Sequence, residues 1–413
     1  MKSKYYIRQS CRLCSSNRLN LVLPLQPTAL CDAYVKADRV DHAQDKYPLD
    51  LYQCDECGFA QIGCIVDPET IYEDYIYVSS SSLDLSDHFD SYANSVLRSV
   101  ECSSNTLVVD IGSNDGLLLR NFEKKGMRVL GIEPARETAN KAINSGVDTL
   151  IDYFNSKTAE KVIKDYGHAG IVTVNNLFAN IDELDDFVAG IRKLLSPDGV
   201  LIIEASYLID LIQNMVFDYI YHEHLSYFSV RPLKIFFNRM GMELFHVERI
   251  QTKGGSIRLY MQLSGGSRPV QPSVDKMIKD EEENGLYNLD IYREFSAKIN
   301  STKLSLRNML TKLKKDNKTI AAYGGSATST TLIYHFGLDD FIEYIVDDNP
   351  AKQNTFSPGL HIPVLPSSMI YERNPDYIVL LAWRFAKPII KKHEDYLQQG
   401  GHFILPLPEV EVV

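Results

Sequence analysis

The 413-residue sequence lacks the features that mark membrane, secreted and nucleic-acid-binding proteins. No apolar run approaches the roughly 20 residues that a membrane-spanning helix needs, and residues 1–8 lack the apolar core of a signal peptide. The formal net charge is −11, so there is no basic surplus for general nucleic-acid binding. These absences predict a cytoplasmic protein with no membrane and no nucleic acid among its partners.

The chain has seven cysteines, and this odd number argues against a framework made entirely of disulfides. Four of them form two Cys-x-x-Cys pairs, Cys11 with Cys14 and Cys54 with Cys57. Two such knuckles can complete a tetrahedral thiolate site for zinc, although reduced structural thiols or a redox pair are alternatives. The pattern favours a zinc-binding module over residues 1–66. The zinc would be structural, because four thiolates leave no coordination position open.

Residues 106–116 combine a strand-like apolar run with a glycine turn at residues 112–116, and good helix formers follow. This order opens a nucleotide-binding unit, whose ligand lies at the carboxyl end of the strand. The turn reads GSNDG rather than GxGxxG, and Asp115 puts a carboxylate where a pyrophosphate would lie. A cationic ligand without phosphate, such as S-adenosylmethionine (SAM), tolerates that carboxylate. The residues predicted to bind SAM are Asp110, Gly112, Asn114, Asp115, Glu133, Asn175 and Asn176.

Further strands and helices extend this unit into an α/β core. A strand is predicted at residues 128–132, and Glu133 at its end can accept the ribose hydroxyls of the ligand. Another is predicted at residues 170–174, so Asn175 and Asn176 would meet the methionine part or the reacting centre. A helix is predicted over residues 182–195 with Asp182 as its N-cap.

The stretch FDYIYHEHLSYFS at residues 217–229 is the densest in chemically active side chains. Its two histidines flank a glutamate and can bind a metal, but a lone His-x-His lacks a second ligand cluster. Alternatively, His224 is a general base, with Tyr221 on the same face if the segment turns helically. Tyr221 would then orient the base or donate to an oxyanion, and Glu223 would fix the imidazole tautomer. A buried loop that merely satisfies these side chains is the third interpretation.

The C-terminal part of the chain contains a second Rossmann-like pattern without a GxGxxG, which argues against NAD binding. Residues 271–317 are charged, with apolar residues at helical spacing, which predicts one or two bridging helices. A strand at residues 320–323 precedes Gly324, Gly325 and Ser326, which open a helix. Such a helix N-terminus can bind an anion, and a packing turn is the alternative.

The paired knuckles, DIGSNDG and YHEHLSYFS together make the chain resemble the SAM-dependent sugar C-methyltransferases over essentially its whole length. The resemblance implies a zinc-binding module, a class I SAM methyltransferase core and a C-terminal Rossmann-like α/β domain that holds a nucleotide diphosphate. It also implies that His224 deprotonates a nucleotide-linked keto-deoxysugar beside its ketone, and that the enolate attacks the SAM methyl group. The substrate residues that it implies are Tyr77, His88, Lys253, Gly324, Gly325, Ser326, Trp383 and Arg384.

Two positions depart from the family pattern, which often has histidine where Asn180 and Lys253 stand, so the sugar and its stereochemistry stay open. Two alternative functions also stay open: a sugar O- or N-methyltransferase and a non-catalytic nucleotide-sugar-binding protein. The oligomeric state, monomer or small homo-oligomer, stays open as well. The expected segments are a zinc module (1–66), a lid or linker (67–99), a methyltransferase core (100–270), bridging helices (271–317) and a nucleotide-binding α/β domain (318–413).

Overall fold

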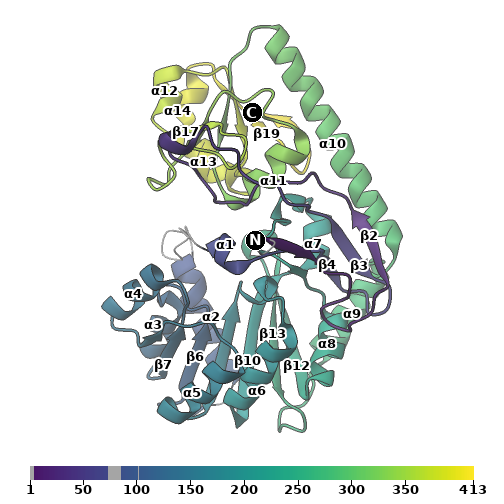
Figure 1. Cartoon of the computed structure of the whole chain (residues 1–413), viewed down its shortest axis with the longest axis vertical. Coiled ribbons are helices and arrows are strands. Elements are labelled where there is room, and N and C mark those ends of the chain that lie inside the picture. Colours follow the sequence, from purple (N-terminus) through teal and green to yellow (C-terminus); the bar gives the residue numbers. More distant parts are fainter. Residues whose placement is uncertain (1–3, 73–84, 101) are drawn as a thin grey trace.

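The computed structural model describes residues 4–72, 85–100 and 102–413. Figure 1 shows a central α/β domain in the lower half of the view and a second α/β domain above it, with the purple N-terminal segment between them. The long helix α10 (Leu289–Lys315) runs along one side of the upper domain. Tyr77 lies outside the described residues. Among the helices of the described part, none combines the length and the apolar character needed to cross a membrane.

A seven-stranded sheet with the order β12-β13-β10-β9-β6-β7-β8 forms the middle of the central domain. The strands from β10 to β8 are parallel, whereas β13 is antiparallel to both of its neighbours. The central position of β6 brings its carboxyl end beside those of β7 and β9, where ligands bind in such sheets. The strands are β6 (Leu107–Ile111), β7 (Arg128–Ile132), β8 (Thr149–Leu150), β9 (Ala169–Asn175), β10 (Leu195–Ser206), β12 (Met242–Ile250) and β13 (Ser256–Leu263).

Helices cover both faces of this sheet, because the side chains along each strand alternate between the faces. Val108 and Ile171 share a core with α2 and α3, while Val109 and Val172 share one with α5, α6 and α8. The helix predicted at residues 182–195 begins only at Leu184, and its N-cap is Glu183 rather than Asp182. The helices are α2 (Leu85–Ser99), α3 (Leu117–Glu123), α4 (Arg136–Asn144), α5 (Ser156–Tyr166), α6 (Leu184–Leu194), α7 (Leu208–Gln213) and α8 (Val230–Arg239).

The N-terminal segment forms a two-stranded sheet, β1-β5, and a four-stranded sheet with the order β11-β4-β3-β2. Strand β11 (Ser226–Tyr227) comes from the stretch at residues 217–229 and pairs with β4, with Ser226 opposite Gln61. The N-terminal module therefore shares a sheet with the segment that carries His224. The other elements are β1 (Tyr5–Ile7), β2 (Leu19–Leu23), β3 (Leu51–Cys54), β4 (Ala60–Ile62), β5 (Cys64–Val66) and α1 (Pro68–Tyr72).

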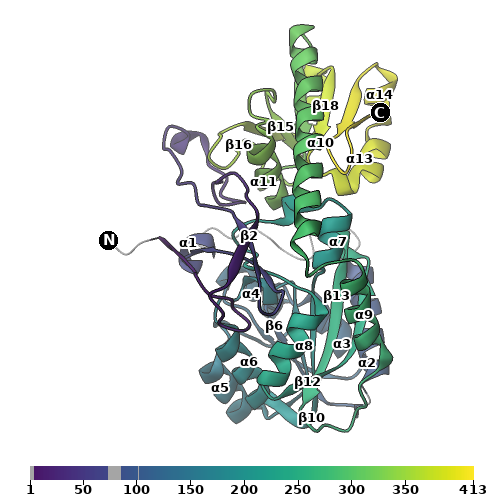
Figure 2. The same cartoon turned by 90° about the vertical axis from the view of Figure 1, so that its right-hand side faces the viewer.

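The C-terminal domain is built on a second seven-stranded sheet, β16-β17-β15-β14-β18-β19-β20. Figure 2 shows α10 upright along this domain, with α9 (Pro272–Glu283) below it on the central domain. The predicted strand at residues 320–323 has the observed bounds. The strands are β14 (Ile320–Tyr323), β15 (Ile345–Asp347), β16 (Thr355–Phe356), β17 (Pro363–Pro366), β18 (Tyr377–Leu380), β19 (His402–Leu405) and β20 (Glu411–Val412). The helices are α11 (Ala327–Phe336), α12 (Met369–Arg373), α13 (Ala386–Lys392) and α14 (Glu394–Gln398).

Candidate functional site

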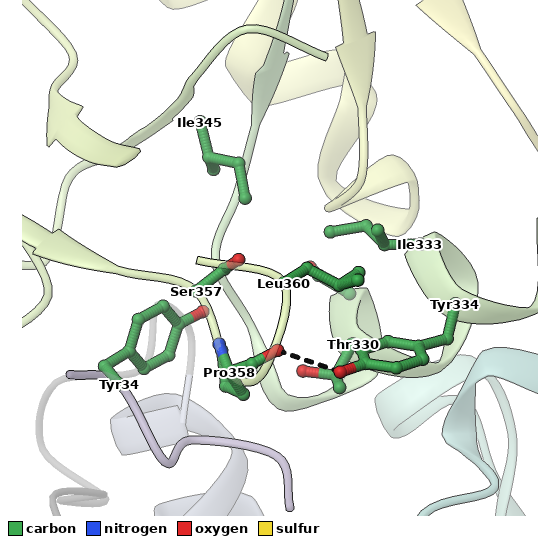
Figure 3. A pocket seen from close by; sticks show the side chains of 9 residues that line it. Tyr34, Thr330, Ile333, Tyr334, Ile345, Ser357, Pro358 and Leu360 are labelled. Atoms are coloured by element: carbon green, nitrogen blue, oxygen red, sulfur yellow. Dashed lines mark hydrogen bonds between the residues drawn. The ribbon is translucent and has the colours of Figure 1, made fainter. Parts of the chain in front are cut away.

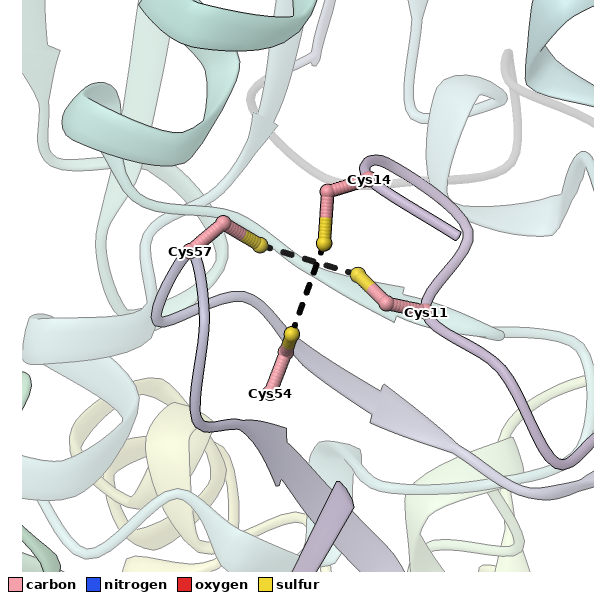
Figure 4. A group of neighbouring side chains, drawn as sticks. All are labelled: Cys11, Cys14, Cys54 and Cys57. Atoms are coloured by element: carbon pink, nitrogen blue, oxygen red, sulfur yellow. Dashed lines mark hydrogen bonds between the residues drawn. The ribbon is translucent and has the colours of Figure 1, made fainter. Parts of the chain in front are cut away.

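The four cysteines of the two knuckles converge on one point, and Figure 4 shows their sulfur atoms facing one another from separate loops. Their Sγ atoms all lie within 4.8 Å of one another. Cys11 Sγ is 3.6 Å from Cys57 Sγ, and Cys14 Sγ is 3.5 Å from Cys54 Sγ. A tetrahedral zinc ion with Zn–S bonds of about 2.3 Å holds its sulfurs roughly 3.8 Å apart. The donor set and its spacing therefore fit a structural zinc ion.

A cavity of about 440 Å³ opens at the carboxyl edge of β6, β7 and β9. This volume is within the range of small-molecule sites. Asp115 does not line the cavity; its carboxylate instead faces Leu117 N at the start of α3, at 3.4 Å. The predicted residues that line the cavity are Asp110, Gly112, Asn114, Glu133, Asn175 and Asn176.

Two buried carboxylates give this cavity its electrostatic character. Glu133 accepts hydrogen bonds from the backbone N–H groups of Asn114 (3.0 Å) and Ala135 (2.9 Å), and Asp110 accepts one from Thr173 Oγ1 (2.6 Å). Burial raises the pKa of Asp110 to about 7; the hydrogen bond from Thr173 opposes this rise and the charge of Glu133 adds to it. Burial also raises the pKa of Glu133. A cationic ligand would favour the ionised form of Asp110, so the cavity suits a sulfonium or an ammonium group.

Gly112 keeps the backbone close to this cavity. Its φ is +75°, and a Cβ atom there would lie 2.8 Å from Leu177 Cδ2. Both facts favour glycine, which alone adopts this conformation without strain and leaves room for a ligand against the chain.

Tyr221 and His224 are brought together by a turn rather than by a helix. The N–H of His224 donates to Tyr221 O at 2.9 Å, and the Tyr221 hydroxyl lies 3.1 Å from His224 Nε2. His224 Nδ1 faces the carbonyl oxygen of Tyr219 at 3.4 Å. Since a carbonyl only accepts, this contact assigns the imidazole proton to Nδ1 and leaves Nε2 as the acceptor. Burial raises the pKa of Tyr221 well above its usual value, so its hydroxyl stays a donor.

Glu223 lies in a different cluster from the His224 ring nitrogens. Its Oε1 atom is 3.3 Å from Cys31 Sγ. Burial and the nearby charge of Asp32 raise the pKa of Glu223 to about 7, while Cys31 and Lys352 oppose this rise. The Tyr219 carbonyl therefore faces the His224 nitrogen whose proton Glu223 was expected to hold.

None of Tyr221, Glu223 and His224 lines the 440 Å³ cavity. However, the backbone next to His224 is hydrogen-bonded to the segment that forms the cavity wall. Leu225 N donates to Ala179 O at 2.7 Å, one residue before Asn180, which lines the cavity. From the first knuckle, the Arg12 guanidinium donates to Leu225 O at 3.0 Å and to Asp182, a lining residue, at 2.8 Å. The zinc module, the cavity wall and the His224 segment thus form one hydrogen-bonded unit.

His88 belongs to a second buried group at the same edge of the sheet. Its Nε2 atom is 2.8 Å from Glu204 Oε1, and Arg258 donates to the other oxygen at 2.8 and 2.9 Å. Burial alone would raise the pKa of Glu204, but His88 and Arg258 outweigh it and lower that pKa. Glu204 pairs with Asn175 across β9 and β10, so His88 lies beside the cavity residues. The side chain of Lys253 lies outside the described part of the structure.

In the C-terminal domain, the glycine turn is bonded to other parts of the protein. Gly325 N donates to the Asp347 carboxylate at 2.6 Å, and Gly325 O accepts from Tyr34 (2.5 Å) and Lys352 (2.7 Å). Ser326 caps helix α11. The void nearby is only about 10 Å³, which is room for roughly one water; Figure 3 shows it between Tyr34 and Tyr334.

Trp383 and Arg384 contact a residue outside the C-terminal domain. Trp383 Nε1 and Arg384 both donate to the buried carboxylate of Asp218 at 3.0 Å. These contacts connect the C-terminal domain to the segment that carries His224.

A comparison with curated proteins finds C-methyltransferase NovU of Streptomyces niveus, which is 30% identical over 404 residues, 98% of this chain and 96% of that protein. The chain belongs to the C-methyltransferase family. Three family models match it in succession: a zinc binding domain at residues 11–72, a methyltransferase domain at residues 87–247 and a C-methyltransferase C-terminal domain at residues 251–408.

Solved structures resemble part of this chain only distantly. Magnesium protoporphyrin IX methyltransferase from Synechocystis PCC 6803 is 12% identical, with a TM-score of 0.33 over 43% of this chain and 79% of that one. The PH0226 protein of Pyrococcus horikoshii OT3 is also 12% identical, with a TM-score of 0.37 over 47% of this chain and 99% of that one.

This C-methyltransferase therefore binds SAM and a structural zinc ion, as the sequence predicts. The fold class is also confirmed: a zinc-binding module, a methyltransferase core and a second α/β domain. Sequence reasoning missed Arg12, Glu204 and Asp218. The position of Arg12 between two cysteines was the one signal in the sequence that could have pointed to it. Glu204 and Asp218 could not be found in this way, because their partners are residues far away in the sequence.

Proposed function

We propose that this enzyme transfers the methyl group of SAM to a carbon beside the ketone of a nucleotide-linked keto-deoxysugar. His224 is the proposed base, and Tyr221 is the proposed hydrogen-bond donor to the oxygen that becomes negative. The observation that carries the proposal is the Tyr221–His224 pair, in which Nε2 accepts and the phenol stays protonated.

The chemistry requires a carbon nucleophile, because a neutral C–H bond does not attack a sulfonium. His224 Nε2 takes the proton from the carbon next to the ketone, and the electrons of that C–H bond form the enolate. The Tyr221 hydroxyl, no longer needed at Nε2, donates to the enolate oxygen. When bound, SAM would supply the methyl group and leave as S-adenosylhomocysteine, which keeps the electron pair of the broken S–CH₃ bond. The enolate electrons form the new C–C bond, the ketone is restored, and His224 returns its proton to solvent.

The proposed nucleotide site is the turn at Gly324, Gly325 and Ser326, at the carboxyl end of β14. Backbone N–H groups at the start of α11 are suited to phosphate oxygens. A diphosphate bound at Gly325 N would replace the Asp347 carboxylate that now accepts from it. Lys352 donates to Gly325 O at 2.7 Å and pairs with Asp32 at 2.6 Å, so a diphosphate at the turn would share this cation with Asp32.

The test is the product formed from a panel of dTDP-, GDP- and CDP-linked keto-deoxysugars with SAM, located by mass spectrometry and NMR. The proposal expects the new methyl group on carbon, beside the ketone. His224→Ala should keep SAM binding by calorimetry and lose turnover, whereas the exposed His168→Ala is the matched control and should keep both. A methyl group on oxygen or nitrogen, or full turnover by His224→Ala, would contradict the proposal.

A further inference from the structure

Asp218 connects the stretch at residues 217–229 to the C-terminal domain. Its side chain is fully buried, and it accepts hydrogen bonds from Trp383 Nε1 at 3.0 Å and from Arg384 at 3.0 and 3.1 Å. Both donors lie in the short helix Trp383–Phe385 that follows β18. The Arg384 side chain is only 18% exposed, so the ion pair is shielded and its loss would leave a buried charge unpaired.

Arg384 also contacts the residue that follows Asp218. Its guanidinium carbon lies 5.4 Å from the centroid of the Tyr219 ring, within the range of a cation–π interaction. The Tyr219 ring centroid is 4.9 Å from that of His224, and the Tyr219 carbonyl faces His224 Nδ1. A displacement of Tyr219 would therefore disturb both the packing and the tautomer of the imidazole.

We propose that the Asp218–Arg384 pair is a positioning device, through which the C-terminal domain holds Tyr219 and thereby the proton-accepting Nε2 of His224. The inference rests on the proposed role of His224 as the base. It makes Arg384 a positioning residue instead of a phosphate ligand. The two terminal nitrogens of Arg384 support this role, because both already have protein partners. One donates to Asp218, and the other donates to Thr328 Oγ1 at 3.3 Å.

The experiment compares Arg384→Met and Asp218→Asn with Arg307→Met as the matched control. Arg307 also donates to an aspartate, Asp340 at 3.0 Å, and lies 5.0 Å from the Phe341 ring centroid, but within the C-terminal part of the chain. The rate of deuterium uptake at the substrate carbon without SAM reports on the base alone. SAM affinity reports on the integrity of the core. Trp383 is the only tryptophan in the chain, so intrinsic fluorescence reports on the contact with Asp218.

Arg384→Met should lower the deuterium uptake rate about 100-fold, the scale expected when a catalytic group is misplaced by about 1 Å. Asp218→Asn should lose less, because the amide oxygen still accepts from both donors. Both variants should change the Trp383 emission and keep the wild-type affinity for SAM. Arg307→Met should match the wild type in all three measurements.

Uptake at the wild-type rate in Arg384→Met would overturn the inference, as would a parallel loss of SAM affinity, which marks a general structural defect. If Arg384→Met does not fold, Arg384→Lys keeps the charge but not the planar fork, and uptake at the wild-type rate there would overturn it equally. Absence of uptake in the wild type would instead remove the proposed base, and the inference with it.

Discussion

Replacing Arg12 by methionine removes the side chain that connects the zinc knuckle to the segment carrying His224. The Arg12 side chain is 0% exposed. It donates to Asp182 at 2.8 Å, to Ile62 O at 3.1 Å and to Leu225 O at 3.0 Å. Methionine fills most of the same volume, so the change removes the charge and the hydrogen bonds without opening a large cavity.

The cost follows from the groups left behind. Breaking a buried ion pair by removing one partner costs about 3–5 kcal/mol. The cost should be at the lower end here, because Asp182 keeps Arg8 at 2.9 Å. Ile62 O loses its side-chain donor, which costs about 1–3 kcal/mol where water cannot replace it, whereas Leu225 O keeps the backbone N–H of Ile62 at 3.1 Å. We expect Arg12→Met to lower the free energy of local opening around β4 and β11 by about 3 kcal/mol.

Native-state hydrogen exchange measures this opening directly, in peptides that contain β4 and the amides of residues 225–227. Exchange there should accelerate about 100-fold, since each 1.4 kcal/mol is about tenfold. Methyl transfer should fall as well, because Leu225 adjoins His224. Arg18→Met is the control: Arg18 pairs with Asp55 in the same module, but its side chain is 63% exposed, so exchange should not change. Unchanged exchange in Arg12→Met would refute the argument that Arg12 holds this segment.

Three further predictions concern the cavity and the metal. Asp110→Asn should remove a pH dependence of stability. Because the pKa of Asp110 is raised to about 7, its carboxyl group stays protonated between about pH 4 and 7 in the folded protein but not in the unfolded chain. The contribution of Asp110 to the free energy of unfolding is therefore lost as pH rises through that window. The variant should gain up to about 4 kcal/mol over the wild type between pH 4 and pH 8 in urea unfolding, and a constant difference would contradict this. Gly112→Ala should weaken SAM binding in calorimetry, because its Cβ would meet Leu177 at 2.8 Å in a left-handed conformation; unchanged affinity would count against the close approach. Cys14→Ser should release zinc in metal analysis and lower methyl transfer, while Cys102→Ser, outside the four-cysteine cluster, should do neither.

Local patterns were sufficient for much of the fold. The strands expected at residues 128–132 and 320–323 have the observed bounds, because apolar runs bounded by turns specify strands locally. The zinc cluster was also predictable, and every residue predicted to bind SAM except Asp115 lines the cavity, since knuckle spacing and strand ends determine where those side chains gather.

The rest depends on contacts between distant parts of the chain. Asp182 has the sequence context of a helix cap, yet it pairs with Arg8 and Arg12, more than 150 residues away in the sequence. Strand β11 is two residues long and carries no periodic signal, so its pairing with β4 was not foreseeable. The proximity of Tyr221 and His224 was expected from a helix, but a turn produces it.

The central claim is that His224 removes a proton from the substrate carbon beside the ketone. The most direct measurement is proton NMR of the accepted keto-deoxysugar nucleotide in D₂O with zinc-loaded enzyme and no SAM. The signal at that carbon should disappear with the wild type and persist with His224→Ala, while both proteins bind SAM equally. Equal loss of the signal with His224→Ala, or its persistence with a wild type that methylates the same carbon, would contradict the account.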